Sequence, residues 1–430
     1  MTALPAQEAA TSKAGKRDAA LLSIGTVASG LLAYAFNVLA ARALGPEAFA
    51  AIGALWAGMF LIAVLLFRPL EQTVARAVAD HVARGTDARR AVRTTAWLGV
   101  AVTTVACLAC IAAWGPITDG LFGGRQALTV ALIAGVAGYA LSYYARGLAG
   151  GVRWFGGYGM VLLADGGVRF LLAVPLLLWS STTLAAVAIG AAAVGGALAP
   201  LLSRDRSALR AIAATEQGEQ FRLAGAARFA APAAVMAGCE QILLSGGPLI
   251  VLIRGGEDAA ATAGVLFAAA LLVRAPVFLF QGVAASLLAN FTTYRAQGDQ
   301  ARLHAATIKV ALICAGIAVL GALGALIAGP LAMDLLYGAG FDATRADLAL
   351  LSLGIGGFLA ASTFSQALLA AEEAGAAAWR WTLATVVFVT LQLTLGGAAF
   401  TRVSVGFAVA GLLVGVLLLV RVWRTNRSLT

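Results

Sequence analysis

Runs of about 20 predominantly apolar residues recur along the whole chain, and they limit its fold more than any other feature. A helix of about 20 residues crosses a hydrocarbon core about 30 Å thick. Of the 430 residues, 61% are hydrophobic and only 12% are charged. So little charge cannot cover the surface of a soluble protein of this length. The sequence therefore predicts an all-α polytopic membrane protein.

About twelve transmembrane helices are predicted from these runs. The second and eighth continue past their apolar part as amphipathic helix, through EQTVARAVADHVARG and QGVAASLLANFTTYRAQG. The predicted spans are 19–42, 48–68, 94–114, 127–147, 159–180, 183–202, 225–253, 260–281, 306–328, 346–371, 375–398 and 402–422.

The basic residues are distributed unequally between the two sides that these spans define. Of the 30 lysines and arginines, 23 lie on the side that holds both ends of the chain and five on the opposite side. Cytoplasmic loops carry such an excess, so both termini are predicted to be cytoplasmic. The net charge of +10 is therefore interpreted as membrane topology, and no nucleic-acid partner is predicted.

A weak phrase occurs twice, 211 positions apart, as GPEAFAAIGALWA from Gly45 and GEDAAATAGVLFA from Gly256. The match extends without a gap to Arg84 and Arg295. A repeat unit of six spans returns the chain to its starting side, which predicts a parallel repeat about an axis along the membrane normal. Two six-helix lobes should then surround a central cleft. The predicted parts are a cytoplasmic N-terminal tail (1–18), an N-terminal lobe (19–202), a cytoplasmic connector (203–224), a C-terminal lobe (225–422) and a cytoplasmic tail (423–430).

No set of residues suited to catalysis is evident, and the chain is predicted not to be an enzyme. Cys107 and Cys110 form a C-x-x-C pair inside an apolar run without further ligands nearby in sequence, so no metal site is predicted. Both histidines, His81 and His304, lie in polar segments. No phosphate-cradling loop is present, and no cofactor is predicted.

Charged residues inside the predicted spans are the main candidate site residues, because a central arginine costs roughly 2.5–3.5 kcal/mol on insertion scales. Asp165 precedes Arg169 by four residues in the fifth span, which places both on one helical face. Arg274 and Glu240 lie near the middle of two sequential antiparallel spans, at similar depth. We predict that both arginines bind substrate in the cleft and that Glu240 and Asp165 act in ion pairs or coupling. Salt bridges that only tie helices together are the alternative.

Three polar residues in or beside the spans, Tyr34, Asn37 and Gln281, are weaker candidates for the substrate site. Such side chains more often form hydrogen bonds between helices than contacts with ligands.

Three segments resemble polysaccharide-type flippases of the multidrug, oligosaccharidyl-lipid and polysaccharide exporter superfamily. They are RALGPEAFAAIGALWA at the first outer turn, YYARGLAGGVRWFGGYG in the second inner loop, and LLYGAGF before the tenth span. The resemblance covers nearly the whole chain. It implies a flippase that moves a lipid-linked oligosaccharide or polysaccharide precursor of the polyprenyl pyrophosphate type across the bacterial cytoplasmic membrane. A glycan polymerase or glycosyltransferases are the protein partners implied.

Three other functions are compatible with the sequence. An ion-coupled multidrug exporter would share the superfamily architecture. A major-facilitator transporter also has twelve spans, but its usual G-x-x-x-D-R-x-G-R/K loop is missing from ARAVADHVARGTDARRA. A polytopic glycan-modifying transferase should have a large outer loop with acidic residues or histidine, and the predicted outer loops are short.

Overall fold

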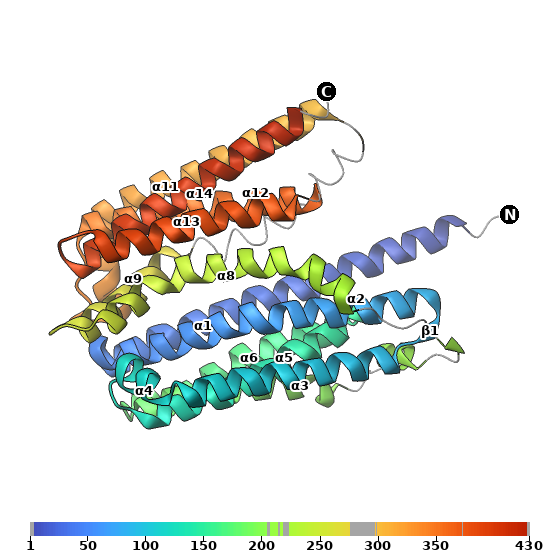
Figure 1. The fold of residues 1–430 in the computed structure, drawn as a ribbon, viewed down its shortest axis with the longest axis horizontal. Coiled ribbons are helices and arrows are strands. Elements are labelled where there is room, and N and C mark those ends of the chain that lie inside the picture. Colours follow the sequence, from blue (N-terminus) through green and yellow to red (C-terminus); the bar gives the residue numbers. More distant parts are fainter. Residues whose placement is uncertain are drawn as a thin grey trace. The chain divides into compact units, whose positions relative to one another are not determined.

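The computed structural model is nearly all helical, as predicted (Figure 1). It describes residues 4–203, 207–213, 216–217, 223–275, 297, 299–371 and 373–427. The elements are α1 (Leu4–Ile62), η1 (Ala63–Phe67), α2 (Arg68–Arg84), β1 (Thr86–Asp87), α3 (Arg89–Ala112), α4 (Trp114–Phe122), α5 (Gln126–Gly151), α6 (Phe155–Ala173), η2 (Val174–Leu177), α7 (Thr182–Leu198), η3 (Ala199–Leu202), η4 (Ser207–Ile212), β2 (Glu216–Gln217), α8 (Leu223–Arg254), α9 (Ala259–Val273), α11 (Gln300–Tyr337), α12 (Arg345–Ala370), α13 (Ala374–Thr394) and α14 (Ala399–Arg427).

Ten helices among the described residues are long and apolar enough to cross a membrane, and α9 is a shorter apolar helix. One of the ten, Gly25–Arg84, contains the second predicted span and residues 25–42 of the first. The chain is therefore a multi-pass membrane protein. The sequence did not predict the short helix α4, and the end of the eighth predicted span lies outside the described residues.

The break between the first two spans occurs at the outer turn identified in the sequence. Gly45 adopts φ 73° and ψ 171° inside α1, a conformation that a residue with a side chain rarely adopts. Pro46 follows, and proline is suited to a first helical position because its missing N–H would be unpaired there. The two residues together divide α1 into two helical segments.

Helix α2 is the amphipathic continuation that the sequence predicted after the second span. It follows a single π turn, η1, in which the N–H of Arg68 bonds to the carbonyl of Ala63. One face of α2 is buried and carries Leu70, Val74 and Val78. The helix ends where Gly85 takes a left-handed conformation with φ 69°.

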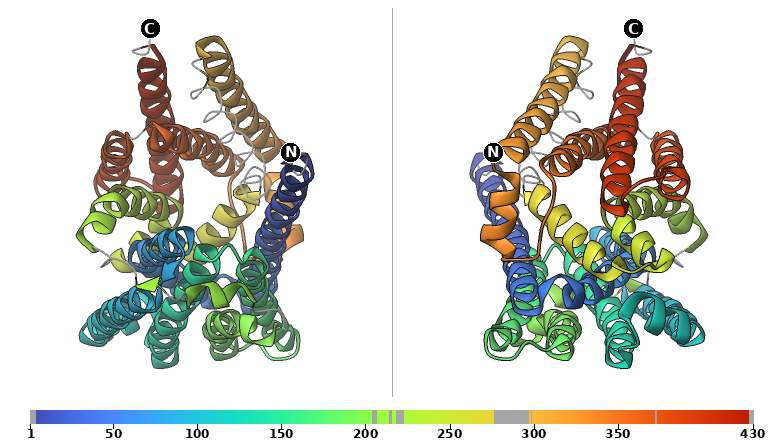
Figure 2. Two further views of the ribbon diagram at one scale, coloured as in Figure 1. Left: turned by 90° about the vertical axis from the view of Figure 1, so that its right-hand side faces the viewer. Right: turned by 90° about the vertical axis from the view of Figure 1, so that its left-hand side faces the viewer.

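The described residues form two compact units. Unit 1 comprises Met1–Phe36, Ile62–Trp114 and Gln126–Ala230, and unit 2 comprises Asn37–Leu61, Gly115–Arg125 and Ala231–Thr430. The helices of each unit are visible as bundles in Figure 2. The division into lobes 19–202 and 225–422 stays a prediction.

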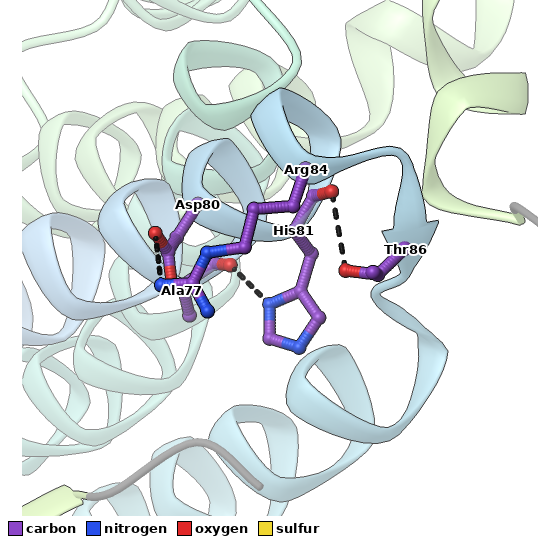
Figure 3. Close-up of polar contacts among 5 residues, drawn as sticks. All are labelled: Ala77, Asp80, His81, Arg84 and Thr86. Atoms are coloured by element: carbon purple, nitrogen blue, oxygen red, sulfur yellow. Dashed lines mark hydrogen bonds and ion pairs between the residues drawn. The ribbon is translucent and has the colours of Figure 1, made fainter. Parts of the chain in front are cut away.

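In unit 1, the segment that follows η3 is attached to the end of α2. Strand β1 pairs in parallel with β2, Thr86 opposite Glu216, and the N–H of Ala88 donates to the carbonyl of Ile212 over 3.0 Å. Figure 3 shows the helix end from which β1 emerges, where Thr86 Oγ1 donates to the carbonyl of His81 over 3.3 Å. Apolar residues of η4 pack on the buried face of α2. Part of the predicted connector therefore belongs structurally to unit 1.

In unit 2, the two copies of the repeated phrase pack against each other. A Cβ placed on Gly53 would overlap the ring of Phe267, and one placed on Gly264 would overlap the carbonyl of Pro46. Gly53 and Gly264 are equivalent positions in the repeat. Ala50 and Leu266 lie in the same buried apolar cluster. Gly53 and Gly264 are therefore positions at which the close approach of these helices leaves no space for a side chain.

Candidate functional site

The fifth predicted span contains a closed polar cluster inside unit 1. The Arg169 side chain is 1% exposed, and its Nη2 donates to Asp165 Oδ2 and to the Tyr139 hydroxyl, each over 2.7 Å. The Tyr139 hydroxyl also donates to Asp165 Oδ1 over 3.3 Å. Asp165 and Arg169 come from α6 and Tyr139 from α5. The Arg169 guanidinium therefore has its counter-charge, Asp165, within its own unit.

Close helix packing around this cluster requires a glycine. A Cβ on Gly196 of α7 would lie 2.9 Å from the carbonyl of Val161 and 3.2 Å from Asp165 Cβ. The absence of that side chain lets α7 approach α6 beside the carboxylate. The burial favours a role for Arg169 in fixing α5, α6 and α7, and direct substrate binding by Arg169 stays a prediction.

Arg274 occupies a different environment, in unit 2. It is the C-cap residue of α9, where the partial negative charge of the helix end favours a cation. It lines a narrow cavity of about 20 Å³ whose other walls include Leu243, Phe407 and Val403. No hydrogen bond or ion pair of the Arg274 side chain is present within the described part of the chain.

The expected salt bridge between Arg274 and Glu240 is absent from the described residues of this conformation. The α8 residues that line the Arg274 cavity run from Leu243 to Pro248. They lie one to two turns beyond Glu240, which is about 5–12 Å at 1.5 Å per residue. The sequence located both residues near mid-span but could not fix the relative depth of the two helices. A coupling role for Glu240, which has another interaction, stays a prediction.

The weaker candidates divide between the units. Tyr34 is partly buried in unit 1, and Asn37 is 7% exposed at the start of the first segment of unit 2. Gln281 lies outside the described residues. Their predicted contact with substrate is not tested by this geometry.

The structure also contains a polar cluster that the sequence did not predict. Arg146 Nη2 lies 2.7 Å from Glu71 Oε2, and the Tyr158 hydroxyl donates to Glu71 Oε1 over 2.7 Å. The Arg146 guanidinium also lies over the Tyr143 ring, 3.7 Å from its centroid. Arg146 and Glu71 are only 14% and 13% exposed. A charge pair, a cation–π contact and a phenol therefore join α2, α5 and α6 at one end of unit 1.

The glycines around Arg146 explain how this cluster is brought together. A Cβ on Gly147 or Gly151 would lie within 3 Å of a backbone carbonyl of α2, so glycine permits the contact between α5 and α2. The chain then turns at Arg153, with φ 57°, and the Trp154 ring covers Gly157. The sequence places Arg146 in the segment YYARGLAGGVRWFGGYG, which was predicted to be an inner loop. The sequence offered one signal for this pair. A glutamate stands in the first turn of an amphipathic helix, and an arginine in an A-R-G segment of another helix could pair with it.

Metal binding has no structural support in the part of the chain that is described, where no group of three His, Cys, Asp or Glu residues could hold an ion.

Comparison with known sequences identifies mycobacterial relatives. The chain is 28% identical over 366 residues to the uncharacterized protein Rv3630 of Mycobacterium tuberculosis, which covers 82% of this chain and 80% of the relative. It is also 28% identical over 414 residues to the uncharacterized protein Rv1510 of the same species, covering 91% and 89%. No protein-family model matches the chain.

Comparison with solved structures shows the fold. An inward-facing MATE family multidrug resistance transporter of the MOP superfamily superposes with a TM-score of 0.76 at 15% identity, covering 93% of this chain and 95% of that one. A MOP superfamily transporter from Pyrococcus furiosus, described as having a binding pocket of reverse polarity, gives 0.68 at 15% identity, covering 96% of each chain. Together with the membrane-spanning helices, these similarities show that the chain has the fold of the MATE transporters of the MOP superfamily.

Proposed function

We propose that this protein is an alternating-access transporter that flips an anionic, lipid-linked oligosaccharide or polysaccharide precursor across the cytoplasmic membrane. Arg274 contacts the pyrophosphate of the carrier lipid. Transport, rather than catalysis, is the role that fits a chain whose structural neighbours are transporters.

The observation that carries this proposal is the position of Arg274. It is the C-cap arginine of the apolar helix α9, inside the predicted span 260–281, at a cavity wall and with no ion-pair partner among the described residues. Such a cation is expensive in the hydrocarbon region, so its retention favours a negatively charged ligand. A guanidinium binds phosphate oxygens through two parallel hydrogen bonds, which suits a pyrophosphate. The Pyrococcus furiosus transporter, described as having a binding pocket of reverse polarity that suggests a different function, offers a precedent within this fold.

A multidrug exporter is the second candidate, because several structures with this fold are described as multidrug resistance transporters. A cationic drug requires a carboxylate rather than an arginine. Glu240 on α8 is the residue that this alternative would use.

The two functions are distinguished by reconstituting the purified protein in liposomes and measuring two substrates. One is a fluorescent glycan on polyprenyl pyrophosphate, whose flipping is followed by quenching from outside. The other is ethidium, whose uptake is followed by fluorescence. We expect flipping of the lipid-linked glycan and at least a tenfold loss of it in Arg274→Gln. Arg274→Lys keeps the positive charge but loses the planar, bidentate donor geometry of the guanidinium, so its flipping rate should lie between those of the wild type and Arg274→Gln.

The matched control is Arg424→Gln, which removes an exposed arginine from α14. Its flipping rate should equal that of the wild type. Ethidium transport that depends on Glu240 and is unaffected by Arg274→Gln would establish the multidrug alternative instead.

A further inference from the structure

A groove on the flank of unit 1 lies between two membrane-spanning helices and has a volume of about 360 Å³. Its walls come from α3 and α5, with Leu70 of α2 at one end. Small side chains create the space, among them Ala96 and Gly99 of α3 and Ala137 and Ala140 of α5. The α3 helix has an exposed apolar surface, with Val100 54% exposed and Trp97 68% exposed. A groove of this kind on a membrane helix faces lipid chains.

Three exposed arginines stand at the end of α3 beside this groove: Arg89, Arg90 and Arg93. Arg89, Arg93, Val100 and Thr104 are spaced by four, seven and four residues, so they share one helical face, and Arg90 lies at the edge of that face, about 60° from Arg93. Val100 and Thr104 line the groove, about 10 and 16 Å along the helix from Arg93 at 1.5 Å per residue. The cations and the apolar groove therefore form one continuous strip.

The charge on this strip is only weakly compensated. Asp87 Oδ1 lies 3.9 Å from Arg89 Nε and also accepts from the Arg89 backbone N–H over 3.0 Å. No carboxylate lies within 4.0 Å of the side chains of Arg90 or Arg93 in the described part of the chain. The arginines also occupy the first turns of α3, where the helix dipole favours an anion. Trp97 follows Arg93 by one turn and is typical of a membrane–water interface.

We propose that this strip binds an anionic phospholipid of the surrounding bilayer. One acyl chain lies in the groove between α3 and α5, and the phosphate is held by Arg90 and Arg93. Bilayer phospholipid is the occupant because the groove is apolar and lipid-facing while its open end is cationic, which matches the two parts of such a lipid. The site is separate from Arg274, which belongs to unit 2.

The test is native mass spectrometry of the full-length protein released from detergent micelles. The probes are phosphatidylglycerol and phosphatidylcholine with identical acyl chains. We expect the protein to retain phosphatidylglycerol in preference to phosphatidylcholine. Each arginine near a membrane surface contributes about fivefold to anionic lipid binding, so Arg90→Gln with Arg93→Gln should lower the retention about 25-fold.

Two matched pairs of variants separate the contribution of the lipid headgroup to binding from that of the acyl chain. Thr104→Phe fills the groove and should abolish retention with every arginine intact, whereas Val105→Phe, at a 67% exposed position outside the groove, should not. Arg424→Gln should leave retention unchanged. Apart from Arg90 and Arg93, the substituted positions are distant from the proposed headgroup site. All the substituted positions are exposed, so each variant should fold, and gel filtration checks this.

Equal retention of phosphatidylcholine, or undiminished retention in Thr104→Phe, would overturn the proposal. So would disulfide cross-linking of two copies of the Thr104→Cys variant, because the groove would then be an interface between protein chains.

Discussion

At the scale of single residues, the charge pairs of unit 1 differ in how strongly water screens them. The Arg146–Glu71 pair is 14% and 13% exposed, whereas the Arg84–Asp80 pair, visible in Figure 3, is 55% and 48% exposed. Exposed pairs contribute about 0–1 kcal/mol, because water and salt weaken the attraction. Removing one partner of a buried pair is far more costly, because the other charge remains without compensation.

Glu71→Gln is therefore expected to lower the free energy of unfolding by about 3 kcal/mol. The measurement is reversible denaturation in mixed micelles. Asp80→Asn, the matched control in the same helix, should cost less than about 1 kcal/mol. The double variant Glu71→Leu with Arg146→Met should recover most of the loss, because no uncompensated charge remains. Equal losses in Glu71→Gln and Asp80→Asn would show that the cluster is not a buried electrostatic contact.

At the scale of elements, the packing of the repeated phrase depends on a missing side chain. Gly264 has no space for a Cβ, because the carbonyl of Pro46 occupies its position. Gly58, on the same helical segment as Gly53, has no neighbouring atom within 4 Å of an added Cβ. Gly264 is therefore required by packing, whereas Gly58 occupies an ordinary helix position.

We expect Gly264→Ala to lower the free energy of unfolding by about 1–3 kcal/mol through overpacking. Gly58→Ala should instead raise it by about 0.5–1 kcal/mol, since alanine is the better helix former. Denaturation of the two variants in parallel provides the measurement. A stabilising effect of Gly264→Ala would mean that the two copies of the phrase do not pack as described.

The helices were predictable from sequence because each span needs a long apolar run whatever its neighbours are. The turn at Gly45 and the amphipathic continuation α2 followed from local chemistry in the same way. The surroundings of Arg146 and Arg274 were not predictable, because they depend on how far one helix is shifted along another. That shift is set by small-residue contacts such as Gly147 on α2, which leave no periodic signal in the sequence.

At the scale of the whole molecule, the predicted topology can be tested with constraints that the structure supplies. The backbone contact between Ala88 and Ile212, 3.0 Å long, requires both to lie on one side of the membrane. Arg42 Nη2 donates to the carbonyl of Leu335 over 2.7 Å, which places these two residues on one side as well.

Reporter fusions at positions 88, 212 and 300 should therefore be cytoplasmic, and those at 120, 256 and 402 should be external. The physical reason is the excess of basic residues on the side that holds both termini. A phosphatase reporter active outside and a fluorescent reporter active inside give complementary readouts. Opposite results at 88 and 212 would contradict the structure, whereas inversion of all six sites would contradict only the predicted orientation.

The first helix also has a mechanical consequence. The chain enters unit 2 between Phe36 and Asn37, inside α1, and returns to unit 1 between Leu61 and Ile62, directly before the π turn η1. It crosses again between Trp114 and Gly115 at the start of α4, between Arg125 and Gln126 before α5, and inside α8 between Ala230 and Ala231. Four of these five crossings lie inside helices, so a relative movement of the units would have to be absorbed mainly by torsions of helical backbone. A π turn is the point at which a helix departs from regular bonding, so we expect Ala63–Phe67 to bend more readily than the regular helices at the other crossings.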